Sequence, residues 1–226
     1  SEQIADDFDA AAAEVTTSSP EAYRLFLEGL RYHYRAEYEK CIESLDKAIT
    51  IDPEFAAAYG WKAFAYESWG YYAEFVKTIK KTHELRHRLK GRERYKYTAY
   101  YYMRIENNIP KALAELQAYV SLYPEDIFAR HQLGSLYFLA FEDYEKCVEY
   151  VRFNIENRIK MFYSYYMAAW AEMCLGNYEK ARDVCELYIG EIGDHPEMQF
   201  SLSVYYLIRG EYDRAQAEIN KADELG

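Results

Sequence analysis

Apolar residues recur along the chain with the period of an amphipathic α-helix. Between residues 39 and 50, Cys41, Leu45 and Ala48 are four and three positions apart, so one face of the predicted helix is apolar. A second helical stretch precedes it, over residues 21–35. No segment has the composition of a strand that could hold an active-site loop. The pattern therefore predicts consecutive pairs of short helices.

A six-residue motif marks the junction between the helices of each pair. Its six copies start at Ala36, Gly70, Asn107, Glu142, Gly176 and Gly210, and these starts are 34, 37, 35, 34 and 34 residues apart. A fixed period of this size is typical of arrays of stacked repeats. Such arrays present extended surfaces to partners and seldom carry chemistry of their own.

The residues at fixed places in each period resemble those of the tetratricopeptide (TPR) family. Small residues stand at the eighth position (Gly29, Ala63, Gly134, Ala169 and Ser203) and at the twentieth (Cys41, Ala112, Cys147, Ala181 and Ala215), and the turn carries an aromatic residue (Tyr38, Tyr72, Tyr144, Tyr178 and Tyr212). In this family, small residues at the two positions let the paired helices approach closely. The resemblance implies an all-α fold, a right-handed superhelical solenoid of about six helix–turn–helix repeats.

The expected array covers residues 20–226, with repeats at about residues 22–55, 56–91, 92–126, 127–161, 162–195 and 196–226. Repeats two and three match less well, because Tyr100 replaces a small residue and three extra residues separate the two motif copies. Residues 19–30, 51–55 and 91–95 also resemble bacterial TPR regions attached to protein kinases, cyclases or transcription regulators. That narrower resemblance implies a module of a longer protein.

The formal net charge of −11 is unevenly distributed. An acidic total argues against nucleic-acid binding, which needs a basic face. Residues 77–96 carry nine Lys and Arg against Glu84 and Glu93, a local charge of +7. This segment is interpreted either as a solvated linker or as a docking patch for an acidic segment. Residues 1–19 carry five acids and no base, and are either a disordered lead-in or a helix that docks in cis.

One motif has the spacing of a catalytic site. His83, Glu84 and His87 match the His-Glu-x-x-His pattern of zinc peptidases, in which two histidines on one helical face hold the metal. Arg86 inside the motif and the surrounding basic residues oppose a dication, and no third ligand is evident. Surface histidines on a basic helix are therefore the favoured interpretation. A zinc-dependent hydrolase is the less favoured alternative, and we predict no catalytic residue, metal or cofactor.

Four cysteines, Cys41, Cys147, Cys174 and Cys185, lack the paired spacings of zinc sites and of a disulfide framework. They are expected to act as small buried residues, and they favour a reducing compartment, which predicts a cytoplasmic location. No apolar run approaches the ~20 residues of a membrane-spanning helix.

The first helix of each repeat lines the concave face in TPR arrays. When the family's groove positions are aligned with this sequence, the resemblance implies a partner-binding groove. Its residues would be Tyr23, Phe26, Leu30, Phe64, Arg94, Tyr97, Tyr101, Arg104, Phe128, His131, Tyr163, Tyr166 and Trp170. The chaperone-binding members hold a C-terminal carboxylate with Lys, Asn and Arg at such places. Here the places are mostly aromatic, which favours a peptide or helix with apolar anchors. Packing between helices, sugar binding and burial in a homodimer are the alternatives.

The sequence thus predicts a non-catalytic protein–protein interaction scaffold. The expected partner is a protein or peptide, with neither nucleic acid nor a membrane span involved. A homo-oligomerisation module of a larger regulatory protein is the alternative function, and a homodimer is left open.

Overall fold

The computed structural model describes residues 17–225, so most of the predicted lead-in at residues 1–19 lies outside the described residues. The described residues form α-helices, one short 3-10 turn and one π-helical turn, and no strand. The predicted all-α class is therefore confirmed. The chain divides into two compact units, residues 1–119 and residues 120–226.

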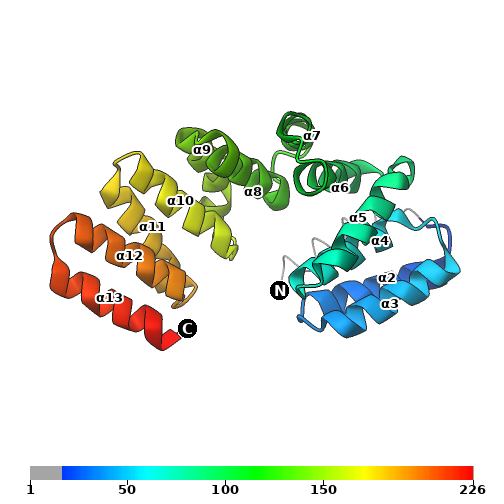
Figure 1. Cartoon of the computed structure of the whole chain (residues 1–226), viewed down its shortest axis with the longest axis horizontal. Coiled ribbons are helices and arrows are strands. Elements are labelled where there is room, and N and C mark those ends of the chain that lie inside the picture. Colours follow the sequence, from blue (N-terminus) through cyan, green and yellow to red (C-terminus); the bar gives the residue numbers. More distant parts are fainter. Residues whose placement is uncertain (1–16, 226) are drawn as a thin grey trace. The chain divides into compact units, whose positions relative to one another are not determined.

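The first unit is built from consecutive helices that pack against their neighbours. They are α2 (Pro20–His33), α3 (Tyr38–Ile51), α4 (Ala56–Ser68), α5 (Tyr72–Glu84), the 3-10 turn η1 (Arg86–Arg88), α6 (Gly91–Arg104) and most of α7 (Ile109–Leu122). Figure 1 shows α2, α3, α4 and α5 side by side, each reversing the direction of the one before. The first helices α2 and α4 also contact each other directly.

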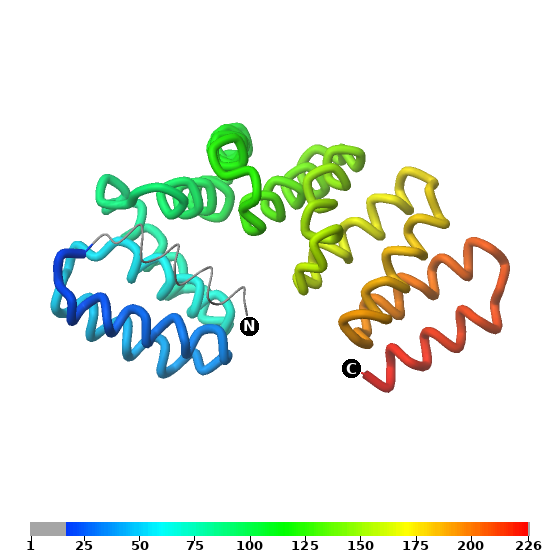
Figure 2. Tube along the Cα trace, turned by 180° about the vertical axis from the view of Figure 1, so that it is seen from behind, coloured from blue at the N-terminus to red at the C-terminus, as the bar shows by residue number. Residues whose placement is uncertain are grey.

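The second unit repeats this arrangement. It contains α8 (Ile127–Leu136), the π-helical turn η2 (Tyr137–Phe141), α9 (Tyr144–Glu156), α10 (Phe162–Cys174), α11 (Tyr178–Glu191), α12 (Pro196–Ile208) and α13 (Tyr212–Leu225). Figure 2 shows the alternation of direction from α10 to α13. The first helix α10 contacts the first helices on both sides, α8 and α12. The first helices of this unit therefore form one continuous layer.

The first position of every motif copy has a left-handed backbone conformation. The first residue of each motif copy has a positive φ: Ala36 57°, Gly70 85°, Asn107 49°, Glu142 51°, Gly176 77° and Gly210 74°. Glycine adopts this conformation without steric cost, whereas other residues lose about 1–2 kcal/mol. A Cβ on any of these three glycines would meet no atom within 4 Å. Backbone conformation, and not packing, therefore explains the glycine at half of the motif starts.

The two helices of a pair come closest where a residue has no side chain. A Cβ on Gly29 of α2 would lie 2.8 Å from Cγ of Leu45 on α3, and a Cβ on Gly134 of α8 would lie 2.6 Å from Cγ1 of Val151 on α9. Real Cβ atoms do not approach this closely, so even one methyl group would force the helices apart. The predicted role of the eighth repeat position in close packing is confirmed at these two sites.

Three of the four cysteines are fully buried, and Cys41, Cys147 and Cys185 each have 0% exposure. Burial raises the pKa of each of these thiols to about 12, so they are uncharged packing residues. The prediction is wrong for Cys174, which is the last residue of α10 and is exposed.

The irregular spacings between motif copies correspond to local changes in helix type. The one extra residue before the fourth copy falls where α8 passes into the π-helical turn η2, which leaves Leu139 74% exposed. The three extra residues before the third copy fall at η1, between α5 and α6. Leu85 and Leu89 flank this turn and are 8% and 4% exposed. Residues 77–96 are therefore anchored to the core by leucines, and they are not a free linker.

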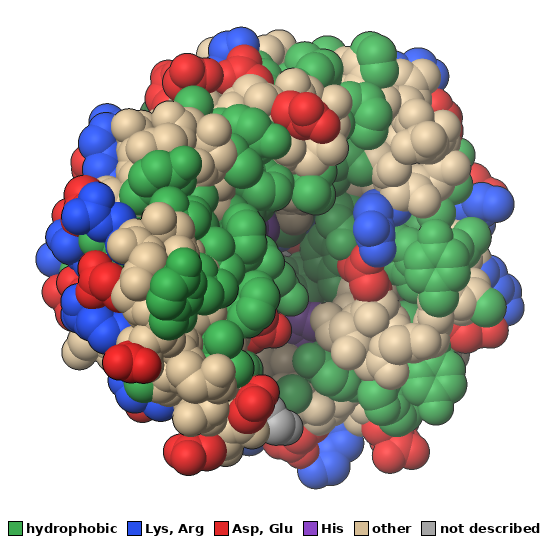
Figure 3. Space-filling view, turned by 60° about the vertical axis from the view of Figure 1, so that its left-hand side comes forward, with side chains coloured by type: hydrophobic (Ala, Val, Ile, Leu, Met, Phe, Trp, Pro, Cys, Tyr) green, Lys and Arg blue, Asp and Glu red, His purple; other side chains and the backbone are tan. Residues whose placement is uncertain are grey.

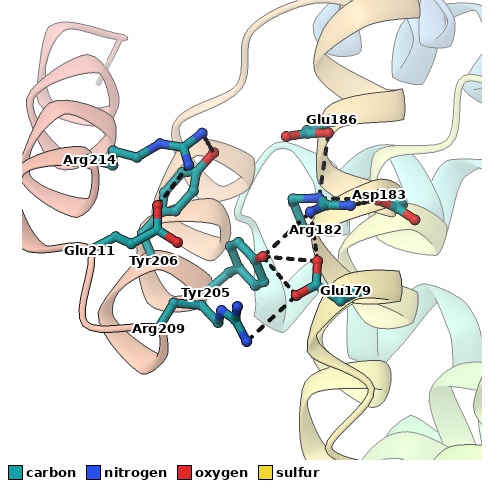
Figure 4. A network of polar contacts seen from close by, with 9 residues as sticks. All are labelled: Glu179, Arg182, Asp183, Glu186, Tyr205, Tyr206, Arg209, Glu211 and Arg214. Carbon is teal, nitrogen blue, oxygen red and sulfur yellow. Dashed lines mark hydrogen bonds and ion pairs between the residues drawn. The ribbon is translucent and has the colours of Figure 1, made fainter.

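A polar network joins the last three helices (Figure 4). The hydroxyl of Tyr205 on α12 donates to the carboxylate of Glu179 on α11, at 3.0 Å, and Arg182 pairs with the same carboxylate at 2.6 Å. Between α12 and α13, Arg214 of α13 donates to the hydroxyl of Tyr206 on α12 at 2.8 Å and lies over the Tyr206 ring. Both tyrosines are buried, so these bonds satisfy phenol groups that would otherwise lack partners.

Replacing Ala36 by glycine should stabilise the protein by about 0.5–1 kcal/mol. Glycine relieves the strain of the left-handed conformation, and this gain exceeds the additional conformational entropy that a glycine loses when the chain folds. The control is the same replacement at Ala217, which is exposed in the middle of α13 and should cost about 1 kcal/mol. Urea denaturation followed by helical circular dichroism measures both. Urea midpoints that shift in the same direction in the two variants would contradict the explanation by backbone strain.

Replacing Gly60 by alanine should destabilise the protein by roughly 1–3 kcal/mol, because the new methyl group would lie 2.2 Å from Cζ of the buried Tyr97 ring. Gly190 on α11 provides the matched control, since a Cβ there meets nothing within 4 Å. Gly190→Ala should leave the thermal midpoint unchanged or raise it. Equal losses in the two variants would show that the Tyr97 contact is not the cause.

Candidate functional site: the aromatic faces of the first helices

The first helices of unit 1 bury several of the predicted groove residues. Phe26, Leu30 and Tyr97 are only 2%, 1% and 1% exposed, so they are core residues and not surface contacts. Phe26 packs against Phe55 with 5.0 Å between ring centroids, and Tyr97 covers Gly60. The prediction of these three as groove-lining residues is corrected by their burial, which follows from the packing of α2 on α4 and of the α6 residue Tyr97 on α4.

The remaining predicted residues of unit 1 lie nearer the surface. Tyr23, Phe64 and Tyr101 are partly exposed, while Arg94 and Arg104 are exposed. Arg104 pairs with Glu67 of α4 at 2.6 Å, and the Tyr100 hydroxyl donates to the same carboxylate. Arg94 lies over the ring of Tyr95, 4.4 Å from its centroid. Both arginines therefore already have contacts within the chain, and neither is set up as a carboxylate clamp.

Unit 1 contains an aromatic cluster around Trp61, of which the predicted groove included only Phe64. Trp61 of α4 packs against His33 of α2, with 5.3 Å between ring centroids, and against Tyr34 and Phe64 at 5.9 and 6.0 Å. The Lys96 Nζ of α6 lies over the Trp61 ring, 5.1 Å from its centroid. The Trp61 indole Nε1 and the His33 Nδ1 are buried and have no hydrogen-bond partner. The sequence signal for this cluster was Trp61 itself, three positions before the predicted groove residue Phe64.

The first helices of unit 2 keep aromatic side chains at the surface. Tyr163 of α10 is 63% exposed and Phe200 of α12 is 50% exposed, and Phe128, Tyr166 and Trp170 are partly exposed. The ring of Tyr163 lies 5.1 Å from that of Phe162. Figure 3 shows hydrophobic side chains at the surface in this view, interspersed with acidic and basic ones. The predicted aromatic row is thus more exposed here than in unit 1.

Polar groups beneath this face hold α8, α9 and α10 together. The Asn154 side chain of α9 is fully buried, and its Nδ2 donates to the Ile127 carbonyl at 3.2 Å and to Ser164 Oγ at 3.1 Å. Ser164 Oγ lies 3.3 Å from His131 Nδ1. Burial lowers the pKa of His131 to about 4, so this imidazole is neutral at pH 7. Asn154 was not predicted, although a polar residue in the Cys147–Val151 stripe of its helix was the available signal.

Trp170 is partly exposed, and its side chain also makes a hydrogen bond within the chain. Its indole Nε1 donates to Ser201 Oγ on α12 at 3.0 Å, and Ser201 Oγ in turn donates to the Glu197 carbonyl at 2.7 Å. Trp170 therefore ties α10 to α12. Tyr163 and Phe200 have no such hydrogen bond to lose, which makes them the cleaner probes of the surface.

The His-Glu-x-x-His residues do not share one helical face. α5 ends at Glu84, and His87 lies beyond the helix end, in the 3-10 turn η1. The His83 ring stacks on Tyr101 with 3.7 Å between centroids, and burial together with Arg86 lowers its pKa. Within residues 17–225 no group of three His, Cys, Asp or Glu side chains has the geometry of a metal site. The arrangement needed for a zinc hydrolase is therefore not formed by this motif.

Comparison with known proteins identifies the class of fold. Residues 25–55, which hold most of α2 and all of α3, match the family model described as tetratricopeptide repeat. No curated protein sequence matches the chain. In residues 17–225, no helix has the length and hydrophobicity needed to cross a bilayer.

Three solved structures show the same fold over most of the chain. PilW, a widely conserved type IV pilus biogenesis factor, is 12% identical with a TM-score of 0.72, covering 89% of this chain and 91% of PilW. Cut9, from the APC/C hetero-tetramer Cut9-Hcn1, is 16% identical with a TM-score of 0.75, covering 99% of this chain and 43% of Cut9. PilF of Pseudomonas aeruginosa is 18% identical with a TM-score of 0.64, covering 88% of each chain. At these identities the likeness establishes a tetratricopeptide-repeat array as the fold.

The stability of the protein should fall as the pH drops from about 6.5 toward 4, in part because His131 resists protonation when folded. The unfolded chain then binds a proton that the folded chain does not, which costs up to about 1.4 kcal/mol per pH unit for this residue. Urea denaturation at pH 7, 6 and 5 measures the slope. His131→Gln should reduce it, and an NMR titration that finds an ordinary pKa for His131 would refute the assignment.

Proposed function

We propose that this chain is a non-catalytic protein–protein interaction scaffold, and that the aromatic face of α8, α10 and α12 binds a peptide or helix of a partner protein. The observation that carries the proposal is the exposure of Tyr163 and Phe200 on adjoining first helices. Exposed apolar patches rimmed by polar residues are typical of binding surfaces, and α10 and α12, which carry these two rings, are in contact. Aromatic side chains also lose little conformational entropy on binding, and they dominate interface energies.

The charge of this face favours an apolar ligand that is neutral or basic. Neither α10 nor α12 contains Lys or Arg, and Glu197 at the start of α12 is exposed. His131 is neutral because of its burial. A ligand carboxylate would therefore find no cation on these two helices. An amphipathic helix or an extended peptide with apolar anchors fits the face better than an acidic C-terminus.

The comparisons support assembly with protein partners by analogy of fold. The Cut9 structure is of a hetero-tetramer with Hcn1, and PilW is described as a pilus biogenesis factor. Such a likeness does not define the partner, since one fold serves many functions. A homo-oligomerisation module, the alternative drawn from the sequence, predicts that the same face binds a second copy of the chain. Sedimentation velocity over a hundredfold concentration range separates that alternative from a scaffold that is monomeric by itself.

Replacing both Tyr163 and Phe200 by alanine should weaken binding to this face by at least tenfold, while the helical circular dichroism signal stays unchanged. The probes are peptides selected from a displayed random library against the intact protein, with affinities measured by isothermal calorimetry. The matched control replaces Tyr178 and Tyr212, which are 37% and 71% exposed at the turns, by alanine. Selected peptides that bind the first variant as tightly as the wild type would refute the proposed face.

A further inference from the structure

An exposed basic surface lies in unit 1, where α5 ends, η1 follows and α6 begins. It consists of Lys80 on α5, Arg86 in η1 and Lys90 just before α6, and all three side chains are exposed. We propose that this basic surface binds a short acidic segment of a partner protein. The proposal goes beyond the function assigned to unit 2, because it concerns other helices and a ligand of opposite charge.

The three cations lie within a short stretch of folded chain. Lys80 stands about one helical turn before the end of α5, roughly 6 Å along the helix axis. Arg86 Nη1 donates to the His83 carbonyl at 2.9 Å, so its guanidinium lies against the last turn of α5. The Leu89 N–H donates to the Arg86 carbonyl at 3.1 Å, and Lys90 follows this tight turn directly. The three cations therefore gather at one end of α5.

The charge of the basic surface is not neutralised by the described part of the chain. Neighbouring cations are paired, since Lys81 lies 3.1 Å from Glu84 and Arg88 lies 3.8 Å from Glu54. In residues 17–225, no carboxylate forms an ion pair with any cation of the basic surface. Residues 77–90 carry six Lys and Arg against one acid, a formal charge of +5 in a chain whose total is −11. A carboxylate brought to this surface therefore meets cations that are free to pair with it.

The fold itself does not explain a cation at the start of α6. Lys90 is the N-cap residue of this helix, and its side chain makes no capping hydrogen bond. A helix carries a partial positive charge at this end, which disfavours Lys and favours Asp, Asn or Ser. The other second helices, α3, α7, α9, α11 and α13, have net charges between 0 and −2. The basic surface is therefore a departure from the repeat that neither capping nor packing requires.

The composition of the surface indicates the class of ligand. Every exposed residue from 77 to 90 is Lys, Arg, His or Glu, while Ile79, Leu85 and Leu89 are buried. Peripheral membrane contacts use exposed apolar side chains, and single-stranded nucleic acids stack on exposed aromatic rings. Residues 77–90 expose no apolar side chain and contain no Phe, Tyr or Trp. Recognition here therefore depends on charge.

The size of the basic surface favours a short ligand. A bilayer or a nucleic acid presents negative charge over a long distance, so it would also meet the acidic remainder of the chain. A short acidic segment interacts mainly with charges within one Debye length, about 10 Å at 0.1 M salt. An acidic segment of a protein is therefore the ligand that this surface fits best.

An NMR titration of the ¹⁵N-labelled protein with an acetylated and amidated octapeptide of glutamate tests the proposal. Backbone signals of residues 77–90 should shift, and raising the salt from about 20 to about 200 mM should weaken binding at least tenfold. The double change Lys80→Glu with Lys90→Glu should weaken binding at least tenfold at the lower salt. The matched control, Lys160→Glu with Lys180→Glu, reverses two exposed lysines of unit 2 and should leave the affinity within twofold.

Two checks separate loss of binding from other effects. Lys90→Glu puts an acid at the start of α6, which the helix dipole favours, so this double variant should keep the helical circular dichroism signal of the wild type. Tyr163→Ala with Phe200→Ala should bind the octapeptide as the wild type does. The outcome for the basic surface is thus independent of the outcome for the aromatic face of unit 2.

Four results would overturn the proposal. The first is no binding at the lower salt, and the second is a set of shifts confined to residues outside 77–90. Equal losses in the two lysine double variants would show that only the total charge of the protein matters. Tighter binding of a synthetic single-stranded oligonucleotide, or of vesicles containing phosphatidylserine, that is lost in the Lys80→Glu and Lys90→Glu variant would assign the surface to another class of ligand.

Discussion

The close approach of helices at residues without side-chain bulk is the contact on which the array depends. Gly29 and Gly134 bring the two helices of a pair together, and Gly60 lets α4 accept the ring of Tyr97 from α6. The same device therefore works within repeats and between them. Each helix is only 10–14 residues long, and helices of this length are marginal by themselves. Packing at these places converts a row of weak helices into two compact units.

This packing leaves the aromatic residues with two different roles. Tyr97, Tyr119 and Tyr165 are at most 1% exposed, and they fill space between helices. Tyr163 and Phe200 lie on the same kind of helix but remain exposed. The Tyr163 ring contacts the rings of Phe162 and His131 at its edge of the helix layer, but neither Tyr163 nor Phe200 fills the core. A surface role is therefore the more economical explanation for them.

The sequence predicted the helix pairs well because their signals are local. Periodic apolar residues define each helix, and the left-handed backbone position explains why glycine recurs at the motif starts. The burial of individual side chains was harder to predict, as Phe26 and Tyr97 show. The register of a repeat gives the direction in which a side chain points, whereas its burial depends on how closely the next helix approaches. The break between His83 and His87 likewise depends on where α5 ends, which spacing alone does not reveal.

The two first-helix faces differ in charge although they share a fold. In unit 1, α6 carries three basic residues in its first two turns, and Lys96 lies against Trp61. In unit 2, α10 and α12 have no basic residue. Apolar anchoring is available on both faces, so it cannot distinguish their ligands. Charge can, since an acidic ligand would meet basic residues on α6 and none on α10 or α12. The faces of one array can in this way favour ligands of different charge.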